Sequence, residues 1–260
     1  MPTKKEVGVA TGKGAIDAIP FVGGLINRYI DLHENEETKR IRQEFDNRLS
    51  NYEHALEELK NQIYEQLNLI PPENIVMPSF SLICAAIEAA KYQIDDANLR
   101  GMFAHLIGNS MNCERTNLTH PAFVEIIKQL TPDEAKILNF MPIKQDFKAG
   151  EPIIDICYEK ENRDGIFIYF SNISVIGFEA GCEYPQNVPT YINNLCRLGI
   201  FEISNEELAD TWRYEKIENS PFYMELKSQI KNCIPRKRMF RLTDLGIAFC
   251  CVCLPLKKID

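Results

Sequence analysis

Apolar residues recur along residues 31–69 in steps of mostly three and four, and this spacing predicts one long helix. Charged and amide side chains fill the other positions. A helix of about 35 residues would be about 50 Å long. Its apolar stripe needs a partner surface, which later helices of the same chain or the same helix of a second copy could equally provide. The positions of this candidate self-association seam are Phe45, Leu49, Tyr52, Leu56, Leu59 and Ile63.

Helical periodicity continues to about residue 130. Pro71 and Pro72 end the first pattern, because neither residue permits an unbroken helix. The stretch "FSLICAAIEAAKYQI" then indicates a buried helix with small Ala residues. Asp95 and Asp96 begin the next helix, "DDANLRGMFAHLIGNSMN", where acidic side chains favour the N-terminus. We therefore expect residues 31–130 to form an all-helical domain.

Two helix starts lie close together in "THPAFVEIIKQLTPDEAKIL". Thr119 is the expected cap of the first, and the side chain of His120 could instead cap or order this loop. Thr131 and Glu134 have the spacing of a capping box, with a proline at the first helical position. We expect a tight corner between the two helices and a domain boundary near residue 130.

Strand and helix patterns alternate after this boundary. "PIIDICYE" and "GIFIYFSNISVIGF" are rich in Ile, Phe, Tyr and Val, which predicts strands. "NVPTYINNLCRLGIFEI" predicts a helix up to Gly199 and a strand after it, Ser204 is expected to cap a further helix, and "RKRMF" predicts a strand before a closing helix capped by Thr243. This order resembles a winged-helix module. We expect an α+β, mostly α fold with a leader at 1–30, a helical domain at 31–130 and a winged-helix-like domain at 131–260.

The leader contains a Gly-Lys pair and an apolar stretch. A phosphate-binding loop is not expected, because Gly14 stands where Ser or Thr should hold the metal. Residues 15–30 are too short and too broken by Asp17 and Pro20 to span a bilayer. They indicate a flexible leader with a short buried helix, or alternatively a segment that docks on a partner or on a membrane surface.

Charge and cysteine usage narrow the class of protein. The net charge is −8 and neither half of the chain is basic, so broad attraction to nucleic acid is not expected. The nine cysteines lie mostly in apolar surroundings, as at Cys84, Cys157 and Cys196, which is typical of buried thiols in a reducing compartment. We expect a cytoplasmic protein, with peripheral membrane contact through residues 15–30 as an open alternative.

Candidate chemistry is sparse. Cys250 and Cys253 would share a helix face, but no second pair of ligands has a spacing that would complete a zinc site. The four His residues single out no partner for a nucleophilic Cys. We therefore expect no catalytic residue, cofactor or metal ligand, and an enzyme is the least favoured class. The candidate contacts for nucleic acid or a partner are the cations beside the late strand, Arg236, Lys237, Arg238 and Arg241.

"HPAFVEIIKQLTPDEAKIL" and the later "LTDLG" resemble the abortive infection alpha family, over roughly residues 70–255. The resemblance implies a part in bacterial phage exclusion, in which an infected cell stops supporting the phage, and it supplies no catalytic residue. We expect a non-enzymatic interaction or effector protein that binds a protein partner or forms a homo-oligomer. A DNA-binding regulator is the alternative. The matching positions include His120, Pro121, Phe123, Thr131, Glu134, Thr243 and Gly246.

Overall fold

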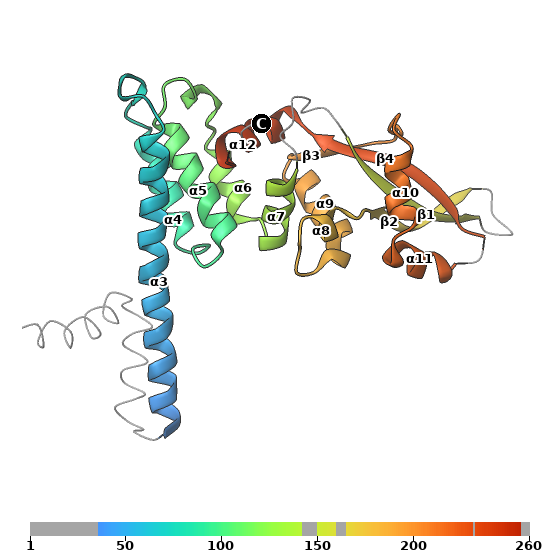
Figure 1. Cartoon of the computed structure of the whole chain (residues 1–260), viewed down its shortest axis with the longest axis horizontal. Helices are drawn as coiled ribbons and strands as arrows, with labels where there is room; N and C mark the ends of the chain where they lie inside the picture. Colours follow the sequence, from blue (N-terminus) through green and yellow to red (C-terminus); the bar gives the residue numbers. More distant parts are fainter. Residues whose placement is uncertain (1–35, 142–149, 160–164, 231, 256–260) are drawn as a thin grey trace, which may run out of the picture. The chain divides into compact units, whose positions relative to one another are not determined.

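The computed structural model describes residues 36–141, 150–159, 165–230 and 232–255. The chain forms two compact units that divide between Glu58 and Leu59. In the first unit, the described residues form the N-terminal part of helix α3 (Glu36–Asn68), which has 33 residues in all. The second unit contains the end of α3 and all the other described elements (Figure 1). The predicted leader and its apolar segment, residues 15–30, lie outside the described residues.

A group of helices opens the second unit. Asp96 caps α5, since its side chain accepts hydrogen bonds from the backbone N–H groups of Asn98 and Leu99. Of the two side chains expected at the start of α6, His120 is the one that orders it, because His120 Nδ1 accepts from the Ala122 N–H at 3.1 Å while Thr119 donates to the Thr116 carbonyl. These helices are α4 (Phe80–Ala90), α5 (Ala97–Ser110), α6 (Ala122–Lys128) and α7 (Pro132–Phe140), with short 3-10 turns at Pro72–Asn74 and Thr116–Leu118.

The predicted capping box at Thr131 is confirmed. The Glu134 N–H donates to Thr131 Oγ1 at 3.2 Å, and the Thr131 N–H donates to Glu134 Oε2 at 2.7 Å. The side chain of Glu134 also accepts from Asn194 Nδ2 at 2.7 Å, which joins α7 to α9 (Val188–Arg197). The cap therefore begins a helix and also fixes the position of that helix against a later one.

Four antiparallel strands form one sheet in the order β2-β1-β4-β3. β1 and β2 pair as neighbours in sequence, and β4 lies between β1 and β3. The pairing of β1 with β2 shifts register on both sides of Ile156, so the hairpin contains an irregularity there. The described strands all follow Thr131, as expected, and the α+β class is confirmed. Their bounds are β1 (Glu151–Glu159), β2 (Ile166–Ile173), β3 (Phe201–Ser204) and β4 (Ile234–Leu242).

Helices α10 (Trp212–Glu218) and α11 (Pro221–Ser228) follow β3. The helix start predicted at Ser204 is wrong. Ser204 Oγ accepts from the Glu206 N–H, which makes a turn, and the Leu208 N–H donates to the Tyr214 hydroxyl, so this segment folds as a loop against α10. The strand predicted over "GIFIYFSNISVIGF" ends at Ile173, and its last residues instead begin α8 (Ile176–Glu179), so that part of the prediction is wrong; α11 is additional to the predicted elements. The core between α10–α11 and the sheet is formed by Ile154, Ile156, Ile173, Tyr214, Ile217 and Tyr223.

The last described helix, α12 (Asp244–Cys253), packs against α5 (Figure 1). The rings of Phe123 and Phe249 meet edge to face, with centroids 5.4 Å apart. Asn109 and Arg115 donate to the carbonyls of Val252 and Cys251 and so satisfy the C-terminal end of α12. A helix that follows residue 131 thus completes the core formed by α5 and α6. The expected domains at 31–130 and 131–260 stay predictions.

Candidate functional site

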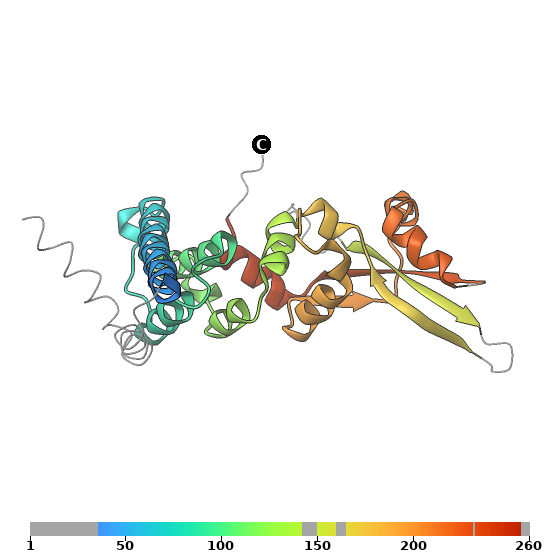
Figure 2. The same cartoon turned by 90° about the horizontal axis from the view of Figure 1, so that it is seen from below.

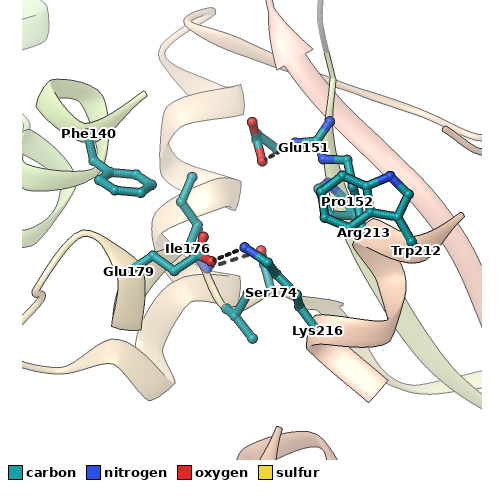
Figure 3. Close-up of a pocket in the computed structure, with 10 residues that line it drawn as sticks. Phe140, Glu151, Pro152, Ser174, Ile176, Glu179, Trp212, Arg213 and Lys216 are labelled. Carbon is teal, nitrogen blue, oxygen red and sulfur yellow. Dashed lines mark hydrogen bonds and ion pairs between the residues drawn. The ribbon is translucent and has the colours of Figure 1, made fainter. Parts of the chain in front are cut away.

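A pocket of about 320 Å³ lies where the start of β1, the turn into α8 and the first turn of α10 meet (Figure 3). Two partly exposed aromatic side chains, Phe140 and Trp212, lie on opposite sides of it. Between them the lining is a mixture of apolar side chains and ion pairs. The lining residues include Glu151, Pro152, Ser174, Ile176, Glu179, Arg213 and Lys216.

Two ion pairs supply the charge of the pocket. Arg213 Nη2 donates to Glu151 Oε2 at 2.7 Å, and Nη1 of the same guanidinium donates to the Gly150 carbonyl at 2.8 Å. Lys216 Nζ lies 3.0 Å from Glu179 Oε1 in a more exposed pair. Burial raises the pKa of the Glu151 carboxyl, and the charge of Arg213 opposes this shift without cancelling it. Each cation of the pocket therefore has a carboxylate beside it, and the carboxyl group of Glu151 ionises less readily than usual.

The lining offers groups for binding rather than a nucleophile with its base. The pocket has no His or Cys among its lining residues, and the Ser174 hydroxyl accepts a hydrogen bond from the Ile176 N–H at the turn into α8. Paired charges give little net attraction for an ion. Aromatic walls with a few fixed polar groups suit a small uncharged or zwitterionic molecule with a flat apolar part.

A second polar cluster lies inside the sheet. Asp155 is fully buried, and Arg238 Nη2 donates to its Oδ1 at 2.6 Å. The Asn172 N–H donates to the same oxygen at 2.9 Å, and Asn172 adopts φ 58°, a left-handed conformation at the irregular part of the hairpin. Asn172 Nδ2 then donates to Asn193 of α9. The cluster holds β1, β2, β4 and α9 together through one buried charge pair.

The four cations predicted as a contact surface do not form one patch. Successive residues of a strand face opposite sides of the sheet, so Arg236 and Arg238 face away from Lys237 and Arg241. Arg238 is bound to Asp155, Arg241 donates to Glu202 at 2.6 Å, and Lys237 lies 3.2 Å from Glu218. Arg236 donates to Asn205 Oδ1 at 2.8 Å. Their role as nucleic-acid or partner contacts stays a prediction.

The family-like residues near the end of the chain form a close junction between α9, β3 and α12. Gly199 ends α9 with φ 75°, and its carbonyl accepts from the Thr243 hydroxyl. That hydroxyl also accepts from the Gly246 N–H at 2.9 Å, and the Thr243 N–H donates to the Ile200 carbonyl at 3.0 Å. A Cβ on Gly246 would lie 2.1 Å from the Ile200 oxygen, so the junction requires glycine there.

The other residues that match the abortive infection alpha pattern also have structural roles in this fold. Pro121 precedes the first turn of α6, and Phe123 is fully buried against α12. His120 orders the start of α6, while Thr131 and Glu134 form the capping box. These contacts give the motif a role in folding.

All nine cysteines are free thiols. Burial raises the pKa of Cys250 to about 12 and that of Cys253 well above its usual value, so both thiols stay protonated at neutral pH. Cys157 is buried as predicted, but Cys196 is only half-buried and Cys84 is exposed. The last prediction is wrong because α4 buries another face, formed by Leu82, Ala86, Ala89 and Ala90. In the described parts of the chain, no three His, Cys, Asp or Glu residues are grouped so that they could hold a metal ion.

The seam predicted on the long helix is described only in part. Leu59 is buried and Ile63 is half-buried, so the C-terminal end of the seam already has neighbours within this chain. Tyr52 and Leu56 lie further back on α3, and the side chains of Phe45 and Leu49 lie outside the described residues. Self-association through the seam stays a prediction.

Sequence reasoning missed the pocket and the buried cluster. Glu151 and Arg213 are 62 positions apart, and nothing local in the sequence pairs them. The signals that could have been used were the single Trp, at 212 beside Arg213, and a carboxylate, Asp155, in the middle of an apolar strand. A lone acid in such a strand indicates a buried partner.

The sequence model of a family described as abortive infection alpha matches residues 51–253, so the match includes the second half of α3, which the resemblance noted above did not cover. No curated protein matches the chain. A solved structure of an uncharacterized protein from the hydrocarbon-degrading marine bacterium Alcanivorax borkumensis SK2 is similar, with 20% identity and a TM-score of 0.33 over 54% of this chain and 94% of that one. A TM-score this low supports no inference about function. Because the family model covers most of the sequence, this protein belongs to the abortive infection alpha family.

Proposed function

We propose that this protein acts in bacterial defence against phage by abortive infection, from a cytoplasmic location. The observation that carries the proposal is the family match over residues 51–253. In this form of defence an infected cell stops supporting the phage, so the protein limits the spread of phage through the population.

The proposed mechanism is non-enzymatic binding, either to a protein partner or to further copies of the chain. Support comes from the length of α3, whose 33 residues extend for about 50 Å and offer a long lateral surface. Leu59 is buried, whereas Tyr52 and Leu56 are half-buried and keep part of their side chains exposed, so we assign the binding surface to the earlier seam positions, Phe45, Leu49, Tyr52 and Leu56. Contact of residues 15–30 with a membrane surface is a variant of this mechanism. No helix in the described ranges is both long and apolar enough to cross a bilayer.

A DNA-binding regulator is the alternative function. It is favoured by four cations within six residues of β4 and by the order of α9, β3 and β4, which is that of a winged helix except that α10 and α11 stand between β3 and β4. The carboxylates beside Lys237 and Arg241 reduce the charge that phosphate groups would meet. Substituting Arg236 and Lys237 by Gln tests it, since Arg238 belongs to the buried cluster. Duplex retardation that weakens with salt and with these substitutions supports the regulator, and a chain that never retards DNA at low salt removes it.

A phage-challenge assay tests the defence role directly. Cells that express the intact chain should give fewer plaques than cells with an empty vector. At high phage-to-cell ratios the expressing culture should collapse without releasing a normal burst, while at low ratios it should survive. Equal plaque numbers and equal bursts across a panel of unrelated phages would contradict the proposal.

Matched substitutions on α3 test the seam. Leu49→Lys with Leu56→Lys places two charges seven residues apart on the seam, and Asn47→Lys with His54→Lys places two charges with the same spacing at exposed positions. Protection should be lost with the first pair and kept with the second at equal protein levels. Protection that survives the seam pair rules out this surface as the mechanism.

A further inference from the structure

β2 is an edge strand of the sheet. The order β2-β1-β4-β3 gives it one neighbour, β1, and none of the other described strands pairs with its outer side. An outer edge presents a row of backbone N–H and C=O groups that can pair with a further strand.

The composition of β2 leaves this edge without the usual protection. Its sequence, IFIYFSNI, contains no Lys, Arg, Asp, Glu or Pro, the residues by which sheet edges normally avoid pairing with another chain. Ile166, Ile168 and Tyr169 are 58%, 50% and 57% exposed, respectively. In Figure 2 the ends of β1 and β2 beside their connection extend past α10 and α11. The exposed apolar part of β2 is thus its first half.

This half of the strand is held in shape by aromatic contacts. The Tyr158 ring lies 5.8 Å from the Phe167 ring and 6.0 Å from the Tyr169 ring, centroid to centroid, and Tyr169 meets Phe170 at 4.8 Å. The buried Asp155 cluster fixes the other end of the hairpin through Asn172. A strand that is already ordered loses little conformational entropy when it pairs, so the edge is preorganised for binding.

We propose that β2 pairs antiparallel with β2 of a second copy and so makes a two-fold symmetric dimer with a continuous eight-stranded sheet. The absence of charge on β2 favours a second copy as its partner, because two identical uncharged strands need no opposite charges in order to pair. A partner recognised by charge would need opposite charges along the strand, and β2 has none. Two chains of net charge −8 repel each other, and an uncharged strand is where they can meet at low electrostatic cost.

The geometry of the pair keeps the nearby charges apart. Glu159 of β1 is the residue that pairs with Ile166. In a β1–β2–β2–β1 arrangement the two Glu159 side chains are at least three strand spacings apart, about 14 Å, which exceeds the Debye length of about 8 Å at physiological ionic strength. Identical Ile and aromatic side chains lie opposite or diagonal to each other across the two-fold axis, and such cross-strand pairs stabilise antiparallel strands. The contact is closed, so it makes a dimer and no longer assembly.

Light scattering after size exclusion tests the dimer on purified full-length protein. The unmodified chain should have twice the mass of one chain, and Ile168→Lys should give a monomer with an unchanged circular dichroism spectrum. Met77→Lys is the matched control, because it places the same charge at an apolar side chain that is 92% exposed outside the sheet, and it should remain dimeric. A monomeric unmodified chain at all concentrations, or an Ile168→Lys variant as dimeric as the unmodified chain, would overturn the proposal.

A photo-cross-linking amino acid at position 169 adds a measurement that needs no destabilising change. Benzoylphenylalanine is close to Tyr169 in shape and should join two chains within residues 166–173, as peptide mapping would show. A chain that is dimeric by light scattering but gives no inter-chain cross-link from position 169 would show that the copies meet elsewhere and would refute pairing through β2. Both measurements use isolated protein, so their failure leaves the defence role untouched, just as a failed phage challenge leaves the dimer untouched.

Discussion

Replacing Gly246 by alanine should destabilise this protein, whereas the same replacement at Gly101 should stabilise it. Both glycines lie in helices, where alanine is favoured over glycine by about 1 kcal/mol. Around Gly101 a new Cβ meets no atom within 4 Å. At Gly246 it would lie 2.1 Å from the Ile200 oxygen and 3.0 Å from the Ile200 carbonyl carbon, which are backbone atoms that cannot rotate away.

The size of the effect follows from the junction. Ordinary contact begins at 3.4 Å, so α12 would have to move from β3 by 3.4 − 2.1 = 1.3 Å. The hydrogen bonds from Thr243 to Gly199 and Ile200 bridge this gap and would lengthen. Overpacking costs about 1–3 kcal/mol and each weakened hydrogen bond up to about 1 kcal/mol, against about 1 kcal/mol gained in helix propensity. The net loss for Gly246→Ala should be about 2 kcal/mol.

Urea unfolding and thermal melting measure this difference. For a unit of this size about 2 kcal/mol corresponds to a melting temperature lower by about 4–8 °C. Gly101→Ala should melt at or above the temperature of the unmodified chain. If Gly246→Ala is at least as stable as the unmodified chain, the reasoning about the junction is refuted.

Three further outcomes are expected. Asp155→Ala should lower the free energy of unfolding in urea by about 3 kcal/mol, because it leaves the guanidinium of Arg238 inside the sheet without its carboxylate. Adding Arg238→Met to this variant should restore part of the lost stability. If the two substitutions instead lower the free energy of unfolding by strictly additive amounts, the pairing is contradicted. The stability difference between the unmodified chain and Asp133→Asn should be complete above about pH 5 and shrink below it, because the folded pKa of Asp133 is lowered and its contribution disappears on protonation. A difference that does not change down to about pH 3 would contradict this. Fluorescence of Trp212, the single Trp, should titrate with a midpoint above 4.5 that is absent in Glu151→Gln, and a midpoint at or below 4.5 would argue against a buried Glu151.

The Asp133 shift has a clear structural cause. Burial by itself acts to raise the pKa of this carboxyl, but the N–H groups of Tyr184 and Glu183 donate to it at 2.9 and 2.8 Å. Lys136 and the Tyr191 hydroxyl lie within 3.1 Å as well, and together these donors lower the pKa below its usual value. The ionised form is therefore the one that binds α7 to the loop before α9.

Local signals predicted most of the elements correctly. The caps at Thr131 and Thr243 depend on residues within three positions of each other, and the structure contains both. Ser204 has the same local pattern and fails, because the loop after it is held by the Tyr214 hydroxyl from a later helix. The pocket and the Asp155–Arg238 pair join residues 62 and 83 positions apart, and periodicity within a segment contains no information about such partners.

The position of α12 has a consequence for synthesis of the chain. α5 spans Ala97–Ser110, and the helix that covers it spans Asp244–Cys253. A ribosome adding about 5–20 residues per second needs about 7 to 27 seconds to make the chain between them. During that interval the nascent α5 and its neighbouring helices expose the apolar surface that Phe249 and other residues of α12 will cover, so chaperones can bind this surface until α12 has been made.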